Sequence, residues 1–304
     1  SSKRQKCWVL PGAPCIAGWK SNKQHCELNR MNENKPLLLA QRKDVEQASR
    51  HLQLHLTAML QQLTWPAVVG ISGAQGSGKS TLAAELVAQL KLHGIQAAAV
   101  SLDDYYVSQA QRQQLAEHVH PLLRQRGVPG THNIGQALRD AKSVLANQPV
   151  ALPQFDKALD EPAVAKPPRR LQVLIVEGWC LGVAPQPEAE LTEPVNHLEQ
   201  REDKDGRWRQ FVNSQLAGPY AEYWQLLRPL IWLKAPDWDS VCRWRAQQEQ
   251  QLWQKRGTGM SDQQLSRFML PFQRLTLASW QQLPPLADYI VTLDSQHNIH
   301  FTHD

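Results

Sequence analysis

The sequence lacks any hydrophobic run long enough to cross a membrane. Its longest apolar stretches, residues 66–71, 171–176 and 230–233, are far shorter than the roughly 20 residues that span a bilayer. The mean hydropathy of −0.48 also disfavours a membrane protein. Since 42% of the 304 residues are hydrophobic and 11 are tryptophan, the chain can nevertheless bury a core. We therefore expect a globular protein with no membrane partner.

Cysteine is scarce, and its spacing fits no metal site. The five cysteines form no CxxC pair, and His25 alone completes no zinc pattern. Cys180 and Cys242 stand isolated in the body of the chain, which is typical of a reducing compartment. We therefore expect a cytoplasmic protein.

Most of the chain also lacks the basic excess that a net charge of +5 suggests. Residues 1–30 hold six of the 33 basic residues and one of the 28 acidic residues, which leaves 27 of each sign for residues 31–304. A neutral body argues against a nucleic-acid partner. We interpret residues 1–30 as a disordered leader or upstream segment and residues 31–304 as a single domain.

Short, continuously apolar segments alternate with helical patterns along this body. Buried strands covered by helices on both faces are typical of a parallel sheet, so we expect an α/β fold with five parallel strands. Residues 184–206, rich in proline and acidic side chains, are expected to form a surface excursion. The expected strands are residues 67–72, 95–102, 171–176, 230–233 and 287–293, and the expected helices include residues 45–63, 81–92 and most of 108–150 and 243–275.

The segment after the first expected strand matches GxxxxGK[ST] at every fixed position. Small residues let backbone N–H groups turn inward around a β-phosphate, and the following helix adds its positive end. Lys79 is placed to reach β- and γ-phosphate oxygens, and Ser80 can ligate Mg²⁺. The predicted nucleoside-triphosphate site comprises Gly73, Ala74, Gln75, Gly76, Ser77, Gly78, Lys79, Ser80 and Thr81.

Two signatures of other P-loop proteins are missing. The chain has no NKxD motif, which normally gives guanine specificity, and no LSGGQ-like transporter signature. These absences leave enzymes that use ATP, including kinases of small molecules.

Three acidic residues follow the expected strands. Asp103 and Asp104 end the second strand and Glu177 ends the third, where the carboxyl ends of parallel strands face a ligand crevice. A kinase that phosphorylates an alcohol needs a carboxylate to orient the hydroxyl and accept its proton, and a second acid near Mg²⁺. The alternative for either aspartate is a cap on a helix that begins at Tyr105.

Several motifs occur in a fixed order: SGAQGSGKST (72–81), LDDYY (102–106), RGVPGTH (126–132), LPQFDK (152–157) and EGWCLG (177–182). Together they resemble the plant-type D-glycerate 3-kinases, which belong to the phosphoribulokinase, uridine kinase and pantothenate kinase superfamily. The resemblance covers roughly residues 35–300. It implies a P-loop NTPase fold with a helical lid, over about residues 243–275, and ATP and Mg²⁺ as cofactors.

The resemblance also implies roles for individual residues. Asp103 aligns with the catalytic base, with Asp104 as the neighbouring alternative. Arg245 falls in the lid, where arginines close over phosphates, but a solvated helix face is the alternative, since Arg243, Lys255 and Arg256 are also available. Glu177 resembles the Walker-B position, where metal coordination through water, with Ser80 as a second ligand, and simple structural pairing both stay open. The acceptor side, where a carboxylate needs a cluster of cations or donors, is expected to include Asp104, Tyr106, Arg126, Thr131, His132 and Lys157.

The expected activity is transfer of the γ-phosphate of ATP to an alcohol, with D-glycerate, a small hydroxy acid, as the best candidate acceptor. Residues 159–162 depart from the plant pattern at a loop expected to touch the acceptor. A nucleoside, a pantothenate-like alcohol or a sugar phosphate therefore stays open as the acceptor. A non-catalytic ATP-binding protein is the third alternative, although such a protein has no need for the base Asp103.

Overall fold

The computed structural model describes residues 35–257 and 259–300, so the predicted leader, residues 1–30, lies outside the described residues. The chain divides into a unit up to Gln47 and a compact unit from Ala48 onward. The candidate site lies entirely in the second unit. No helix of the described residues has the length and apolar content needed to cross a bilayer.

A sheet with the strand order β2-β5-β1-β6-β7-β8 forms the centre of this unit. The first five strands in this order run parallel, as predicted, and the short β8 pairs antiparallel with β7. The fold-class prediction of an α/β protein with five parallel strands is thus confirmed. The strands are β1 (Ala67–Gly73), β2 (Ala97–Ser101), β5 (Val173–Gly178), β6 (Leu230–Lys234), β7 (Tyr289–Leu293) and β8 (Ile299–His300).

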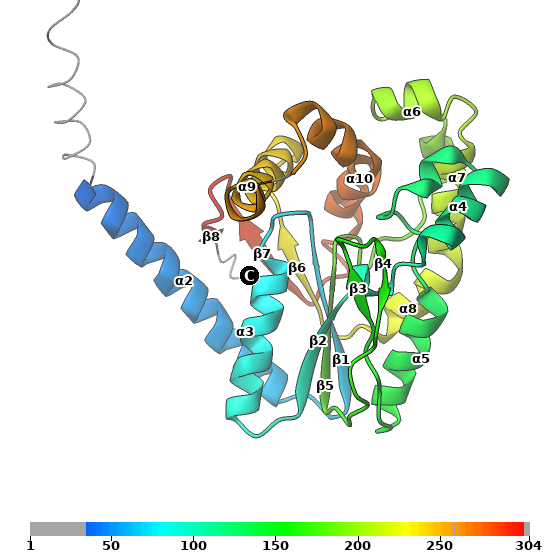
Figure 1. Ribbon diagram of the computed structural model, residues 1–304. Coiled ribbons are helices and arrows are strands. Elements are labelled where there is room, and N and C mark those ends of the chain that lie inside the picture. Colours follow the sequence, from blue (N-terminus) through cyan, green and yellow to red (C-terminus); the bar gives the residue numbers. More distant parts are fainter. Residues whose placement is uncertain (1–34, 258, 301–304) are drawn as a thin grey trace, which may run out of the picture. The chain divides into compact units, whose positions relative to one another are not determined.

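Helices cover both faces of the sheet, with α3 on one side and α5 and α8 on the other (Figure 1). Successive side chains of β1 point to opposite faces, so Val68 joins one hydrophobic cluster and Val69 the other. Burial on both faces explains the continuous apolar runs of the sequence. The longer helices are α2 (Lys35–Gln61), α3 (Lys79–Leu92), α4 (Gln109–His118), α5 (Ile134–Leu145), α7 (Arg207–Gln215), α9 (Trp238–Arg256) and α10 (Asp262–Gln282).

Short elements fill the connections between these helices and strands. A separate antiparallel hairpin of β3 and β4, which the sequence did not predict, follows α5. The bounds are η1 (Leu102–Tyr105), η2 (Pro121–Arg124), β3 (Gln154–Asp156), β4 (Glu161–Ala163), η3 (Glu188–Leu191), α6 (His197–Glu202), η4 (Leu216–Tyr220) and α8 (Ala221–Leu226).

Residues 184–206 lie mostly at the surface, as their composition suggested, but two of their acidic side chains are buried. Glu199 is 1% exposed and forms an ion pair with the buried Arg274 of α10, at 2.6 Å between carboxylate oxygen and Nη2. Asp203 is fully buried and pairs with Arg209 at 2.9 Å. Two of the seven acidic side chains of this segment are therefore part of the interior, where arginines compensate their charge, and the other five are exposed.

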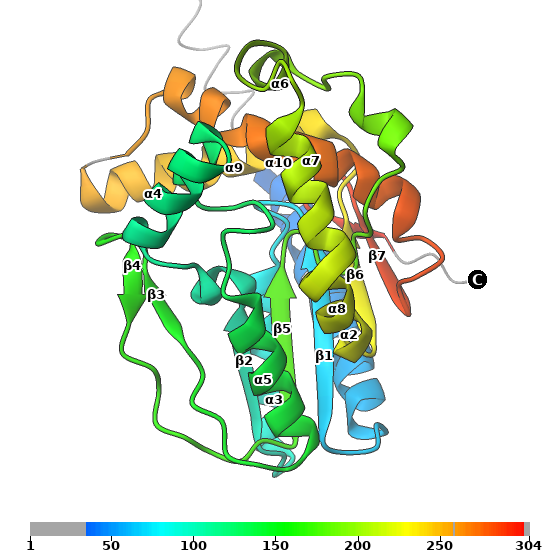
Figure 2. The ribbon, with the colours of Figure 1, turned by 90° about the vertical axis from the view of Figure 1, so that its right-hand side faces the viewer.

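The two helices α9 and α10 correspond to the segment 243–275 that we expect to act as a lid. Figure 2 shows them above the end of the sheet toward which β5 points. That end carries the carboxyl termini of the parallel strands, the usual place for a ligand crevice in such sheets.

Candidate active site

The phosphate-binding loop connects β1, which ends at Gly73, to α3, which begins at Lys79. Gly76 and Gly78 have φ angles of 79° and 88°, a left-handed conformation that favours glycine. An added Cβ on Gly76 would also lie 2.6 Å from the Cβ of Trp244 in α9. Glycine is thus required here both by the turn and by direct packing of the loop against α9.

Ser80 and Glu177 meet beside this loop. The Ser80 hydroxyl donates to Glu177 Oε1 at 2.8 Å, and Lys79 Nζ lies 3.9 Å from Glu177 Oε2. Glu177 is buried, and Oε2 has no hydrogen-bond partner among the described residues. A buried carboxylate oxygen without a donor, next to a hydroxyl, fits a hard cation such as Mg²⁺ directly or through water. The predicted metal ligands therefore lie together.

Asp103 lies in η1, the turn that follows β2, and both of its carboxylate oxygens have partners. Tyr106 donates its hydroxyl to Oδ1 at 2.8 Å, and Lys157 Nζ lies 2.6 Å from Oδ2. Burial alone would raise the pKa of Asp103, but the Lys157 ammonium, the Tyr106 hydroxyl and the charge of Lys79 lower it to about 2. Asp103 is consequently a carboxylate at any physiological pH.

Asp104 has a different environment from its neighbour. Its Oδ2 accepts the backbone N–H of Ser101 at 3.1 Å, which completes a capping box at the start of η1. Its Oδ1 accepts the N–H of Phe155 at 3.3 Å and so ties η1 to the hairpin. Asp104 therefore takes part in helix capping, as the third residue of a helix whose N-cap is Ser101, and both aspartates line the cavity.

Three further predicted cations line the same cavity as the phosphate-binding loop: Arg126, Lys157 and Arg245. Arg245 forms an ion pair with Glu249 one turn later, at 2.7 Å. Arg126 pairs with Asp160, a partner that the sequence analysis did not single out. Asp160 also binds the buried Arg112 and so fixes the hairpin that carries Lys157.

Thr131 and His132 do not line the cavity. Thr131 is fully buried, and its hydroxyl donates to the carbonyl of Val128 within the loop. His132 stacks on Tyr106 at 4.6 Å between ring centroids, and its Nδ1 lies 2.7 Å from the Tyr220 hydroxyl. Burial lowers the pKa of His132 to about 4, against the opposing charge of Asp103, so the ring is neutral at neutral pH. His132 therefore packs against Tyr106 outside the cavity, and Thr131 stabilises the conformation of its own loop.

The cavity has a volume of about 400 Å³. Its aromatic wall was mostly missed by the sequence analysis, because Phe268 and Phe272 lie on a helix about 90 residues after Glu177. The lining residues are Gln75, Gly76, Lys79, Ser80, Ser101, Asp103, Asp104, Tyr106, Arg126, Lys157, Glu177, Trp179, Arg245, Gln248, Phe268 and Phe272.

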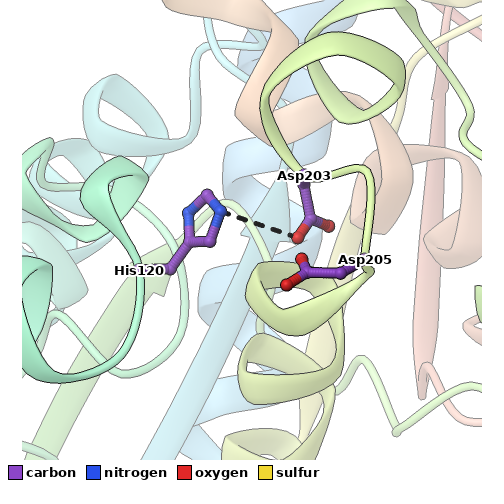
Figure 3. A group of neighbouring side chains, drawn as sticks. All are labelled: His120, Asp203 and Asp205. Atoms are coloured by element: carbon purple, nitrogen blue, oxygen red, sulfur yellow. Dashed lines mark ion pairs between the residues drawn. The ribbon is translucent and has the colours of Figure 1, made fainter.

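Figure 3 shows a second group of possible metal ligands, His120, Asp203 and Asp205, none of which lines this cavity. The backbone N–H of Leu122 donates to His120 Nδ1 at 3.3 Å, so in the neutral ring the proton resides on Nε2, which then has no lone pair for a metal. Asp203 already accepts two backbone N–H groups at the start of α7 and the guanidinium of Arg209. The group is explained as a structural contact between η2 and α7.

Comparison with known proteins identifies the family. The chain is 32% identical over 223 residues to "Uncharacterized kinase mug58" of Schizosaccharomyces pombe, which covers 67% of this chain and 77% of that protein. It belongs to the family of kinases that includes this yeast protein. No family model matches the chain.

Two further relatives have slightly lower sequence identity to the chain. "Probable ATP-dependent kinase TDA10" of Saccharomyces cerevisiae is 28% identical over 263 residues, which cover 78% of this chain and 88% of that protein. "D-glycerate 3-kinase, chloroplastic" of Arabidopsis thaliana is 28% identical over 222 residues, 67% of this P-loop kinase and 45% of that protein. The protein is thus a kinase by family, and its relatives leave the acceptor open.

Proposed function

We propose that this kinase transfers the γ-phosphate of ATP to a hydroxyl group of a small anionic alcohol, with D-glycerate giving 3-phosphoglycerate as the best candidate. One observation carries the proposal. A carboxylate suited to accept a hydroxyl proton, Asp103, lines a single cavity together with the phosphate-binding loop and two cations, Arg126 and Lys157. The chloroplastic relative, which is named for D-glycerate, supplies the particular acceptor.

The nucleotide phosphates would bind at the loop between β1 and α3, with Lys79 on the β- and γ-phosphate oxygens. Ser80 and Glu177 would hold Mg²⁺, which when bound neutralises charge on the transferring phosphoryl group. Arg245, held by Glu249 and with its guanidinium 5.6 Å from the centre of the Phe268 ring, would approach the phosphates from the side of α9 and α10.

Asp103 would orient the acceptor hydroxyl and take its proton as the oxygen bonds to the γ-phosphorus and the bond to the β-phosphate oxygen breaks. Tyr106 keeps the carboxylate in place through its hydrogen bond to Oδ1.

The size and charge of the cavity favour a small acid as the acceptor. About 400 Å³ must accommodate the terminal phosphates as well as the acceptor, which favours a molecule with few carbon atoms. Arg126 and Lys157 offer cationic donors for an anionic group, and Trp179 and Phe272 offer an apolar wall for a carbon chain.

An acceptor screen that detects ADP tests this proposal. D-Glycerate, L-glycerate, glycerol, pantothenate, uridine and a sugar phosphate would each be incubated with the protein and Mg·ATP, with Lys79→Ala as the inactive control. We expect turnover with D-glycerate that depends on Lys79, and little with the neutral acceptors. Efficient turnover of uridine or pantothenate, with none of D-glycerate, would overturn the acceptor assignment.

A further inference from the structure

Lys157 forms an ion pair with the residue that the proposed mechanism uses as the proton acceptor. Its Nζ lies 2.6 Å from Asp103 Oδ2, and the Tyr106 hydroxyl occupies Oδ1. Lys157 directly follows β3, whereas Asp103 lies in the turn after β2, so the pair joins the hairpin to that turn, and both residues line the cavity.

The two members of this pair differ in how firmly they are held. The Lys157 side chain is 60% exposed and the Asp103 side chain only 28%. Such an exposed lysine pair contributes at most about 1 kcal/mol, and its flexible stem can turn to a new partner. Asp103, in contrast, is fixed by Tyr106, whose ring stacks on His132, which in turn contacts Tyr220 at 2.7 Å.

This asymmetry means that an anion entering the cavity competes for Lys157 and leaves Asp103 in place. While the pair exists, the charge and hydrogen bond of the ammonium stabilise the carboxylate of Asp103 and lower its pKa, so the carboxylate polarises a nearby hydroxyl or water poorly. Once Lys157 has turned away, the same carboxylate has an open oxygen and a higher basicity.

We propose that Lys157 alternates between two partners, Asp103 in the absence of acceptor and the anionic group of the acceptor in its presence, and thereby restrains ATP hydrolysis until the acceptor is bound. The inference rests on the proposed role of Asp103 and not on which anionic alcohol is the acceptor. The restrained side reaction is attack of a water oxygen on the γ-phosphorus, with cleavage of the bond to the β-phosphate oxygen, transfer of the water proton to Asp103 and from there to solvent, and release of ADP and phosphate.

The test is ATP hydrolysis by the full chain without any acceptor. Lys157→Met should raise the rate at least about tenfold, a small part of the 10²–10⁴ that a positioned base contributes. Lys142→Met is the matched control, because Lys142 forms an exposed pair of the same length, 2.6 Å, with Glu222 and does not line the cavity. Adding Asp103→Asn to Lys157→Met should abolish the increase.

Acceptor selectivity gives a second measurement. Lys157→Met should lower kcat/KM for D-glycerate by about 10²-fold, the loss expected for a charged contact of a few kcal/mol, and leave kcat/KM for glycerol equal or higher. Lys157→Arg, which preserves the charge, should behave more like the wild type in both assays.

The outcomes separate the possibilities. If hydrolysis by Lys157→Met equals the wild-type rate, Lys157 does not restrain hydrolysis and the inference is overturned. If hydrolysis falls while KM for ATP rises, Lys157 contacts the nucleotide, which also overturns the inference. An increase that survives Asp103→Asn overturns it equally. If the wild type phosphorylates no hydroxy acid, the proposed acceptor is wrong, and the hydrolysis comparison still decides the role of Lys157.

Discussion

Replacing Asp103 by asparagine is expected to remove catalysis and leave the fold intact. The amide keeps an oxygen that can accept the Tyr106 hydroxyl, so the side chain should stay in place. It loses the basic carboxylate, and removal of a general base lowers kcat by about 10²–10⁴. The variant also loses the ion pair with Lys157, whose side chain is 60% exposed. Such a pair contributes at most about 1 kcal/mol to the free energy of unfolding, or roughly 2–4 °C in Tm for a domain of this size.

Asp104→Asn is the matched control for this experiment. Both oxygens of Asp104 accept backbone N–H groups, from Ser101 and Phe155, and an amide offers only one oxygen. One lost hydrogen bond to a charged group costs about 1.5–3 kcal/mol. We therefore expect this variant to lose stability but to keep kcat within a few-fold of the wild type.

The assay is a steady-state ADP measurement with D-glycerate, together with ATP binding by calorimetry and Tm by thermal unfolding. For Asp103→Asn, ATP affinity and Tm should be close to the wild-type values while kcat collapses. The reasoning is refuted if Asp103→Asn retains more than about a tenth of kcat, or if Asp104→Asn loses as much activity as Asp103→Asn.

Three other changes test separate parts of the account. Lys79→Ala should lower kcat by at least about 10²-fold at unchanged Tm, since the lysine stabilises charge on the transferring phosphoryl group, and wild-type turnover would disprove the nucleotide site. Burial raises the pKa of Asp140 to about 6, although the Tyr105 hydroxyl and Arg139 partly offset this effect. The folded protein therefore binds the Asp140 proton more tightly than the unfolded chain does, and this contribution to the free energy of unfolding is lost as the pH rises through 6. Asp140→Asn should then stabilise the protein by about 1 kcal/mol at pH 8 but not below pH 4 in urea titrations, and an equal effect at both pH values would contradict the assignment. Arg274→Met leaves Glu199 buried without its partner and should cost about 3–5 kcal/mol in the free energy of unfolding, whereas a loss below 1 kcal/mol would show that water reaches the carboxylate.

The sheet and the phosphate-binding loop could be predicted because their determinants are local. Each parallel strand is a continuous apolar run, and the loop pattern has fixed spacing between residues 73 and 80. The hairpin of β3 and β4 could not, since its strands have three residues each and Pro162 lies within one of them. The interior position of Glu199 was equally hidden, because it depends on Arg274, 75 positions later.

The candidate site, too, could be predicted from the sequence only in part. Sequence spacing could not distinguish Asp103 from Asp104, because only the folded turn reveals which carboxylate caps it. The resemblance to the glycerate kinases likewise implied that Thr131 and His132 lie near the acceptor, but both side chains are buried and neither lines the cavity. Asp160 was missed as the partner of Arg126 because their pairing joins two loops that have no local pattern in common.

The most direct test of phosphoryl transfer to a small anionic alcohol is ³¹P NMR of the protein with Mg·ATP and D-glycerate. The account predicts that the γ-phosphate resonance of ATP is replaced by one phosphomonoester resonance, that of 3-phosphoglycerate, in equal amount with ADP and with little inorganic phosphate. Loss of ATP to ADP and inorganic phosphate alone, or persistence of ATP with a folded, nucleotide-binding protein, would contradict it.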